Sequence, residues 1–94
     1  MSEDPRPLLV FFGAAHSGPA RRMESLMAHL ARKERDRLRV TAVDVDKSPE
    51  LAEHFGVQTV PTLALVKGNQ VVDRLEGRAS QPKIERMLEP HLVA

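Results

Sequence analysis

The sequence predicts an α/β fold in the order β-α-β-α-β-β-α, with a four-stranded mixed sheet flanked by helices. Three observations support this prediction. Short apolar runs of strand length alternate with two segments whose apolar residues recur at helical spacing. The polar stretch Lys67–Gln70 separates two further apolar runs, as in a hairpin. A strand-helix-strand unit is parallel and right-handed, whereas a hairpin is antiparallel, so the predicted sheet is mixed.

The first strand is expected over Leu8 to Phe12, an apolar run typical of a strand that is covered on both faces. Ser17 is a good N-cap for the helix that follows, and Pro19 suits its first turn. The spacing of apolar residues predicts one buried face on this helix, made of Ala20, Met23, Leu26, Met27, Leu30 and Ala31.

The second strand is expected over Leu38 to Val45, where apolar and polar residues alternate. Its inward positions are predicted to include Leu38, Val40 and Ala42, and its outward positions Arg37, Arg39 and Thr41. Ser48 and Pro49 then begin a short helix that should end at Gly56. That helix is expected to turn three residues inward: Leu51, Ala52 and Phe55.

The hairpin is expected to consist of Thr62 to Val66 and Val71 to Leu75. A last helix should begin after Ser80 and end near Pro90, which cannot continue a helix. Its predicted buried residues are Ile84, Met87 and Leu88.

The chain has 94 residues, 41% of them hydrophobic and 29% charged, with a net charge of +1. These values predict one ordinary globular domain over residues 8–94, preceded by a lead-in over residues 1–7 that contains two prolines. No apolar run approaches the ~18 residues that span a membrane, and no signal-peptide core precedes the fold. We therefore expect a cytoplasmic protein with no membrane partner.

Four segments carry a family resemblance. The turn Ser17-Gly18-Pro19-Ala20 resembles the active-site turn Cys-Gly-Pro-Cys of the thioredoxin family. The segments Gly56–Leu63 and Asp44–Pro49 resemble its Gly-Val-x-x-x-Pro-Thr and Val-Asp-x-Asp-x-x-Pro segments, and Gly77 matches the glycine after its last strand. The resemblance implies a minimal thioredoxin fold that lacks the family's N-terminal strand and helix.

The resemblance also implies a redox-inactive member, because Ser17 and Ala20 stand at the two cysteine positions and the chain has no cysteine. Disulfide exchange requires a thiolate. The family's buried acid falls at Phe11, its lysine partner at Ala42, and two tryptophans at Gly13 and His16. Their joint absence favours a natural, redox-inactive relative. We expect no cofactor, and no disulfide reductase activity because the chain has no cysteine. The alternative is a protein-disulfide oxidoreductase of this family, with a role in cell redox homeostasis, whose cysteines have been replaced.

In the thioredoxin family, the residue before a cis-proline pairs through its backbone with an extended peptide, beside the active-site turn. The resemblance therefore implies a peptide-binding groove and a protein-binding or adaptor role. The groove would consist of His16, Ser17, Gly18, Pro19, Val60 and Pro61.

Three other kinds of site are weaker hypotheses. Ser17 could be a hydrolytic nucleophile with His16 as its base, but no acid lies nearby in sequence, so the N-cap interpretation is favoured. The four histidines lack metal-ligand spacing, and no metal site is expected. The basic run over residues 21–39 is interpreted as a solvated helix face, and no nucleic-acid partner is expected because the chain has no Tyr or Trp for base stacking.

Finally, the strand over Leu38 to Val45 is expected to be an open edge of the sheet. Such an edge can support weak self-association or the capture of an extended partner. A proline at Thr41 should block this association if the Thr41 amide faces outward.

Overall fold

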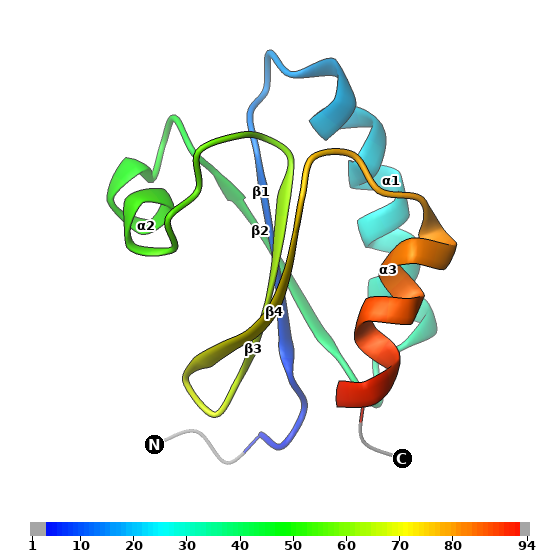
Figure 1. The fold of residues 1–94 in the computed structure, drawn as a ribbon. Coiled ribbons are helices and arrows are strands. Elements are labelled where there is room, and N and C mark those ends of the chain that lie inside the picture. Colours follow the sequence, from blue (N-terminus) through cyan, green and yellow to red (C-terminus); the bar gives the residue numbers. More distant parts are fainter. Residues whose placement is uncertain (1–3, 93–94) are drawn as a thin grey trace.

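The computed structural model describes residues 4–92. These residues form β1 (Leu8–Gly13), α1 (Gly18–Lys33), β2 (Arg39–Asp44), α2 (Pro49–His54), β3 (Thr62–Lys67), β4 (Gln70–Glu76) and α3 (Gln81–Leu88), and a 3-10 turn (Glu89–His91) follows α3 (Figure 1). The element order confirms the predicted β-α-β-α-β-β-α arrangement. No helix within this range is long and apolar enough to cross a membrane.

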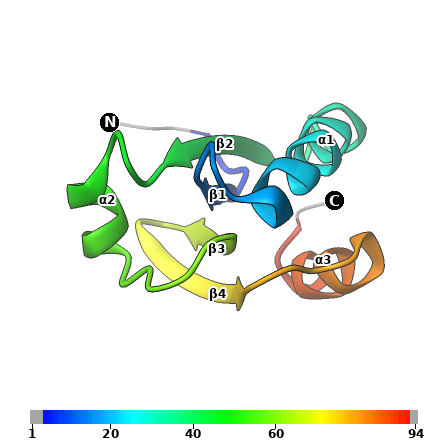
Figure 2. The same cartoon turned by 90° about the horizontal axis from the view of Figure 1, so that it is seen from above.

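The strands form one mixed sheet in the order β2-β1-β3-β4. β1 runs parallel to β2 and antiparallel to β3, and β3 pairs antiparallel with β4. Viewed from above, α1 and α3 cover one face of the sheet and α2 covers the other (Figure 2). β1 is therefore central, which agrees with the burial of both its faces.

Two apolar layers hold the sheet and helices together. On the α1 and α3 side, the largest buried side chains include Leu9, Phe11, Leu30, Leu63 and Ile84. On the α2 side, Val10, Phe12, Ala52 and Ala64 are buried. The ring centroids of Phe12 and Phe55 lie 5.1 Å apart in a tilted arrangement, so one aromatic contact joins β1 to the end of α2.

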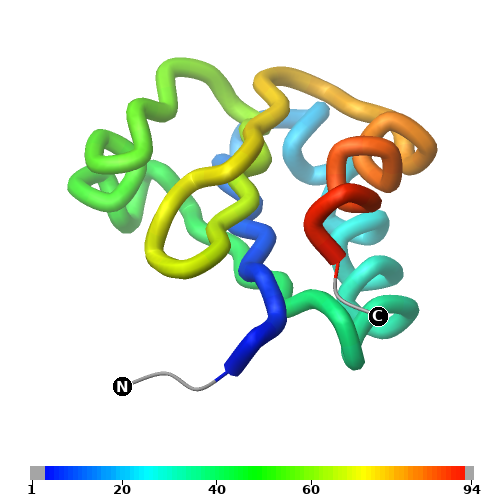
Figure 3. Tube along the Cα trace, turned by 60° about the horizontal axis from the view of Figure 1, so that its bottom comes forward, coloured from blue at the N-terminus to red at the C-terminus, as the bar shows by residue number. Residues whose placement is uncertain are grey.

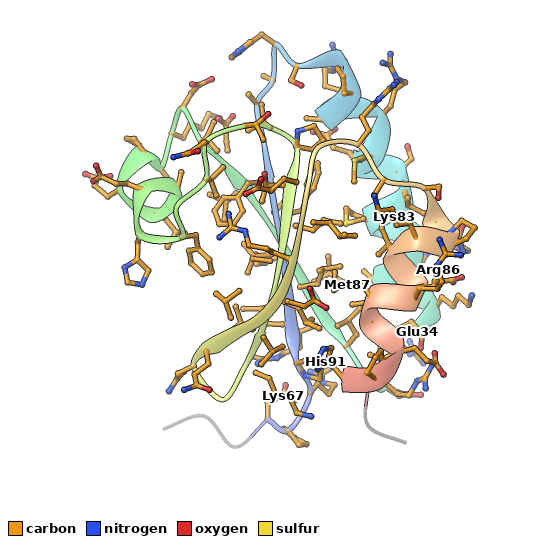
Figure 4. The ribbon with its side chains drawn as sticks, viewed as in Figure 1. Glu34, Lys67, Lys83, Arg86, Met87 and His91 are labelled. Atoms are coloured by element: carbon orange, nitrogen blue, oxygen red, sulfur yellow. The ribbon has the colours of Figure 1, made fainter. Side chains whose placement is uncertain are left out.

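The helix predictions hold for α1 and α3, and partly for α2. Ala20, Met23, Met27 and Leu30 are buried in α1, while Leu26 and Ala31 are half-buried. In α3 the buried residues are Ile84, Met87 and Leu88. Met87 lies between α3 and the sheet (Figure 4), whereas Lys83 and Arg86 are exposed.

Two of the predicted inward positions are wrong. Leu51 is 41% exposed, because the six-residue helix α2 turns only Ala52 fully toward the sheet. Ala42 is exposed as well, because β2 is an outer strand. Ser48 is the N-cap residue of α2, as predicted, but its side chain makes no capping hydrogen bond.

The hairpin is tighter than the sequence suggests. Its strands extend to Lys67 and Gln70, which leaves Gly68 and Asn69 as the turn (Figure 3). Both have positive φ angles, 59° and 66°. A two-residue turn of this kind matches the right-handed twist of the paired strands, and Gly and Asn tolerate it.

One ion pair joins the two helices on the same face. Lys33 Nζ lies 2.8 Å from Glu85 Oε2, and Gln81 donates a further hydrogen bond to the same oxygen. The hydrogen bond from Lys33 is the main reason that the pKa of Glu85 lies below its usual value. Both side chains are exposed, so this ion pair contributes little to the free energy of unfolding.

Candidate functional site

Three segments that are distant in sequence meet at one end of the sheet. Phe12 at the end of β1 pairs with Thr62 at the start of β3, and Thr62 pairs with Glu76 at the end of β4. The loop after β1 and the loop before β3 therefore leave the sheet side by side, at the top of Figure 1. This register brings the predicted site residues His16 to Pro19 to the same end of the sheet as Val60 and Pro61.

The turn after β1 is organised by Ser17. Its backbone amide donates to the Ala14 carbonyl at 3.0 Å, and its carbonyl accepts from the Arg21 amide. Its Oγ accepts a hydrogen bond of 3.2 Å from the Ala20 amide. Pro19 lies in the first turn of α1, where it removes no helix hydrogen bond. The N-cap role of Ser17 is thus confirmed.

The opposing loop contains a cis peptide bond between Val60 and Pro61. Pro61 is buried, and its carbonyl accepts from the Gly77 amide at 2.8 Å. Thr62 Oγ1 donates to the Thr59 carbonyl at 2.7 Å. Within residues 4–92, the amide and carbonyl of Val60 make no backbone hydrogen bond, although the residues that flank it do. Val60 is half-buried.

The space behind the turn is lined mainly by apolar residues. Phe11 and Ala42 are direct partners in the β1–β2 register, and Phe11 is only 2% exposed. Both line a cavity of about 210 Å³, together with Gly13, Ala14, Ala15, Glu24, Val43 and Asp44. The two positions where the family resemblance places a buried acid and its lysine are therefore neighbours, and they hold a phenyl ring and a methyl group.

Gly13 is closely packed in the same region. A Cβ built there would lie 3.2 Å from Phe11 Cε2 and 3.3 Å from Ala20 Cβ. These contacts are tighter than ordinary van der Waals distances, so Phe11 and Gly13 suit each other in size. A larger side chain at position 13 would require Phe11 to move.

One residue near the turn was missed by the sequence analysis. Asp46 Oδ2 lies 3.4 Å from His16 Nδ1, and both side chains are largely exposed. Asp46 is positioned by its own amide, which donates to Asp44 Oδ1 at 2.9 Å. The signal for this pair is topological, because the carboxyl ends of parallel strands such as β1 and β2 meet at one edge of the sheet.

An acid therefore does lie beside His16, contrary to what the sequence suggests. It does not complete a hydrolytic triad, because no hydrogen bond joins His16 to Ser17 among residues 4–92 and the Ser17 Oγ serves as the helix cap. A metal site is not supported either. Among residues 4–92 no three His, Asp or Glu side chains are grouped so as to hold a metal ion.

The basic run over residues 21–39 is partly neutralised by acidic neighbours. Lys33 pairs with Glu85, Arg37 pairs with Glu34 at 2.7 Å, and Arg39 lies 3.6 Å from Asp4. These contacts agree with a solvated surface that carries charges of both signs.

The capping role of Ser17 can be measured directly. We expect Ser17→Ala to lower the free energy of unfolding by about 1 kcal/mol, because the Ala20 amide loses its acceptor. Ser48→Ala is the matched control, since Ser48 also precedes a helix but makes no capping bond. Urea unfolding of both variants checks this, and equal losses of stability would contradict the cap assignment.

Comparison with known proteins gives a consistent result. The family model described as Thioredoxin matches residues 1–90. The chain is 33% identical to Thioredoxin 1 of Nostoc sp. over 86 residues. This match covers 92% of this chain and 80% of the relative. It is 36% identical over 83 residues to a thioredoxin of Alicyclobacillus acidocaldarius, covering 88% of this chain and 79% of the relative.

Solved structures agree with these relatives. The crystal structure of a thioredoxin from Nicotiana alata superimposes with a TM-score of 0.87 at 31% sequence identity, covering 97% of this chain and 77% of that one. The thioredoxin of Fasciola hepatica gives a TM-score of 0.87 at 30% identity, covering 94% of this chain and 83% of that one.

Proposed function

The chain belongs to the thioredoxin family, and we propose that it binds an extended peptide segment of a protein partner without exchanging disulfides. It contains no cysteine, so no residue can form the thiolate that attacks a disulfide sulfur. Binding in this family fold needs only backbone groups and shape, and neither depends on sulfur. We propose a cytoplasmic adaptor or holding role for such a module.

The main observation behind this proposal is the hydrogen bonding of the Val60 backbone. Its amide and carbonyl make no backbone hydrogen bond within residues 4–92, whereas the Thr59 and Pro61 carbonyls on either side accept hydrogen bonds within the fold. A free donor and a free acceptor on one residue are what an added strand uses for pairing.

The neighbouring loop supplies the other side of the groove. His16 is exposed and paired with Asp46, and Gly18 is exposed at the start of α1. Because β1 and β3 are neighbours, a peptide paired with Val60 would run past these residues. The exposed His16–Asp46 pair gives that groove a polar rim.

Site-specific photocrosslinking tests the proposal. A benzophenone amino acid at His16 places the probe in the groove without removing the Ser17 cap. The same probe at Lys67 is the matched control, because Lys67 is exposed at the opposite end of β3 (Figure 4). We expect a discrete crosslinked protein from the His16 probe in extracts of the source cell, and far less of it from the Lys67 probe.

Two results would contradict the proposal. The first is equal crosslinking from both positions, which would show nonspecific contact. The second is the absence of any crosslinked species from the His16 probe. A parallel assay of insulin disulfide reduction should show no turnover above buffer, since the chain supplies no thiol.

A further inference from the structure

The outer strand β2 has one paired edge and one open edge. Within residues 4–92 its only strand partner is β1. The Arg39 amide donates to the Pro7 carbonyl and the Val45 amide to the Gly13 carbonyl, so the odd-numbered residues direct their peptide groups toward β1. By alternation, Val40 and Ala42 direct theirs away from the sheet.

This alternation corrects one expectation. The Thr41 amide faces β1, so a proline at Thr41 would break the existing ladder instead of blocking an outward donor. The Asp44 amide points outward too, but the Asp44 carbonyl already accepts from the amides of Lys47 and Ser48, at 3.1 and 2.9 Å. Val40 and Ala42 are thus the two residues with both groups available.

A hollow accompanies the open edge. It has a volume of about 260 Å³ and lies between β2 and α1. Its lining is mostly apolar and small, and includes Met27, Ala28, Ala31, Val40 and Ala42. Thr41 and Ala42 are the two exposed residues of the strand. The edge therefore offers both free hydrogen-bonding groups and room for an additional side chain.

We propose that β2 pairs antiparallel with β2 of a second copy of this chain, about a two-fold axis at Thr41. In a symmetric antiparallel pair the axis is perpendicular to the sheet, so residues on the same face must oppose each other. If the two-fold axis passes between the two Thr41 residues, Val40 lies opposite the second copy's Ala42. By symmetry, Ala42 lies opposite the second copy's Val40. Each of these two pairs exchanges two hydrogen bonds, which satisfies all the outward groups of Val40 and Ala42.

The charges of the strand favour this orientation. Arg37 and Arg39 lie at its start, and Asp44 and Asp46 lie at its end. Antiparallel pairing brings the basic end of one copy beside the acidic end of the other, whereas parallel pairing would align like charges. A second copy is thereby favoured over an arbitrary strand, because the sequence Arg39–Asp44 complements itself.

The hollow supports the same register. The second copy's Val40 would stand opposite Ala42 on the face that α1 covers, next to Ala28 and Ala31. These small side chains leave space for an added valine. The other outer strand, β4, is less suited to pairing, because its ladder with β3 has a register shift at Leu65 and Val66. Such irregularities protect edges from pairing, whereas β2 pairs regularly over its whole length.

Charge-swap variants at Thr41 test the axis. Thr41 is exposed, so glutamate or lysine there should leave the monomer folded, as checked by circular dichroism. A single strand pair is a small interface, so the wild-type dimer should appear in sedimentation experiments at up to about 1 mM protein. Thr41→Glu and Thr41→Lys should each lose the dimer at that concentration, since like charges then face each other across the axis.

Mixing the two variants should restore dimers, because glutamate then faces lysine. Val71→Glu is the matched control, since Val71 is 44% exposed on the outer strand β4, and it should leave association unchanged. Purely monomeric wild-type protein at about 1 mM would overturn the proposal. So would dimers that persist in both Thr41 variants, or a mixture that fails to recover them.

Discussion

Replacing Phe11 by aspartate should lower the free energy of unfolding by about 4 kcal/mol or more. Phe11 is 2% exposed and belongs to the apolar layer between the sheet, α1 and α3. The substitution removes the ring and leaves a carboxyl group in a space that offers no cationic partner among its lining residues. Small domains have total stabilities of about 5–15 kcal/mol, so this loss is a large fraction of the free energy of unfolding.

Urea unfolding measures this loss, and Phe11→Leu is the control. Leucine keeps an apolar side chain of similar size, so its cost should stay below about 1.5 kcal/mol. The new carboxyl should also remain protonated well above the ordinary aspartate range, because burial disfavours the charged form. A stable Phe11→Asp variant with a freely ionised carboxyl would show that the space is wetter than the structure indicates.

The neighbouring position offers a way to reverse part of the loss. Ala42 is the register partner of Phe11, lines the same cavity and is exposed, so Ala42→Lys alone should change stability little. In the double variant the ammonium can reach the new carboxylate. We expect a favourable coupling of about 0.5–3 kcal/mol in a double-mutant cycle.

Most of the fold follows from local patterns. The apolar run that forms β1, the helical spacing of α1 and the Gly68–Asn69 turn each specify their own conformation. The errors fall where burial depends on partners that are remote in sequence. Leu51 has an apolar side chain but lies on a helix too short to bury it, and Ala42 lies on a strand that has a neighbour on one side only.

The candidate site divides in the same way. The cap at Ser17 is a local feature, and the sequence predicts it. The His16–Asp46 pair depends on two parallel strands ending at one edge, and the free groups of Val60 depend on the pairing of the residues around it. Neither of these two features can be predicted from the spacing of residues along the chain. Three-dimensional register supplies both.

Introducing both family cysteines, as Ser17→Cys with Ala20→Cys, should produce a disulfide-forming pair with very weak reductase activity. A thiol at position 17 would occupy the place of Ser17 Oγ, which accepts from the Ala20 amide at the start of α1. Amide donation and the helix dipole both stabilise a thiolate, so the pKa of this thiol should fall below the usual cysteine value. The second thiol would be buried, because Ala20 is 1% exposed.

Turnover should nevertheless stay about 100-fold or more below that of a thioredoxin with an intact buried acid, since a positioned acid–base group is typically worth that factor. Phe11 and Ala42 place a phenyl ring and a methyl group at the two positions where the family resemblance puts that acid and its lysine partner. Insulin reduction measures turnover, thiolate absorbance measures the pKa of the new thiol, and the two single-cysteine variants are the controls. Turnover equal to that of the comparison thioredoxin would show that Phe11 does not limit the chemistry. A low pKa combined with slow turnover would locate the lost activity in proton transfer behind the turn, and not in the turn itself.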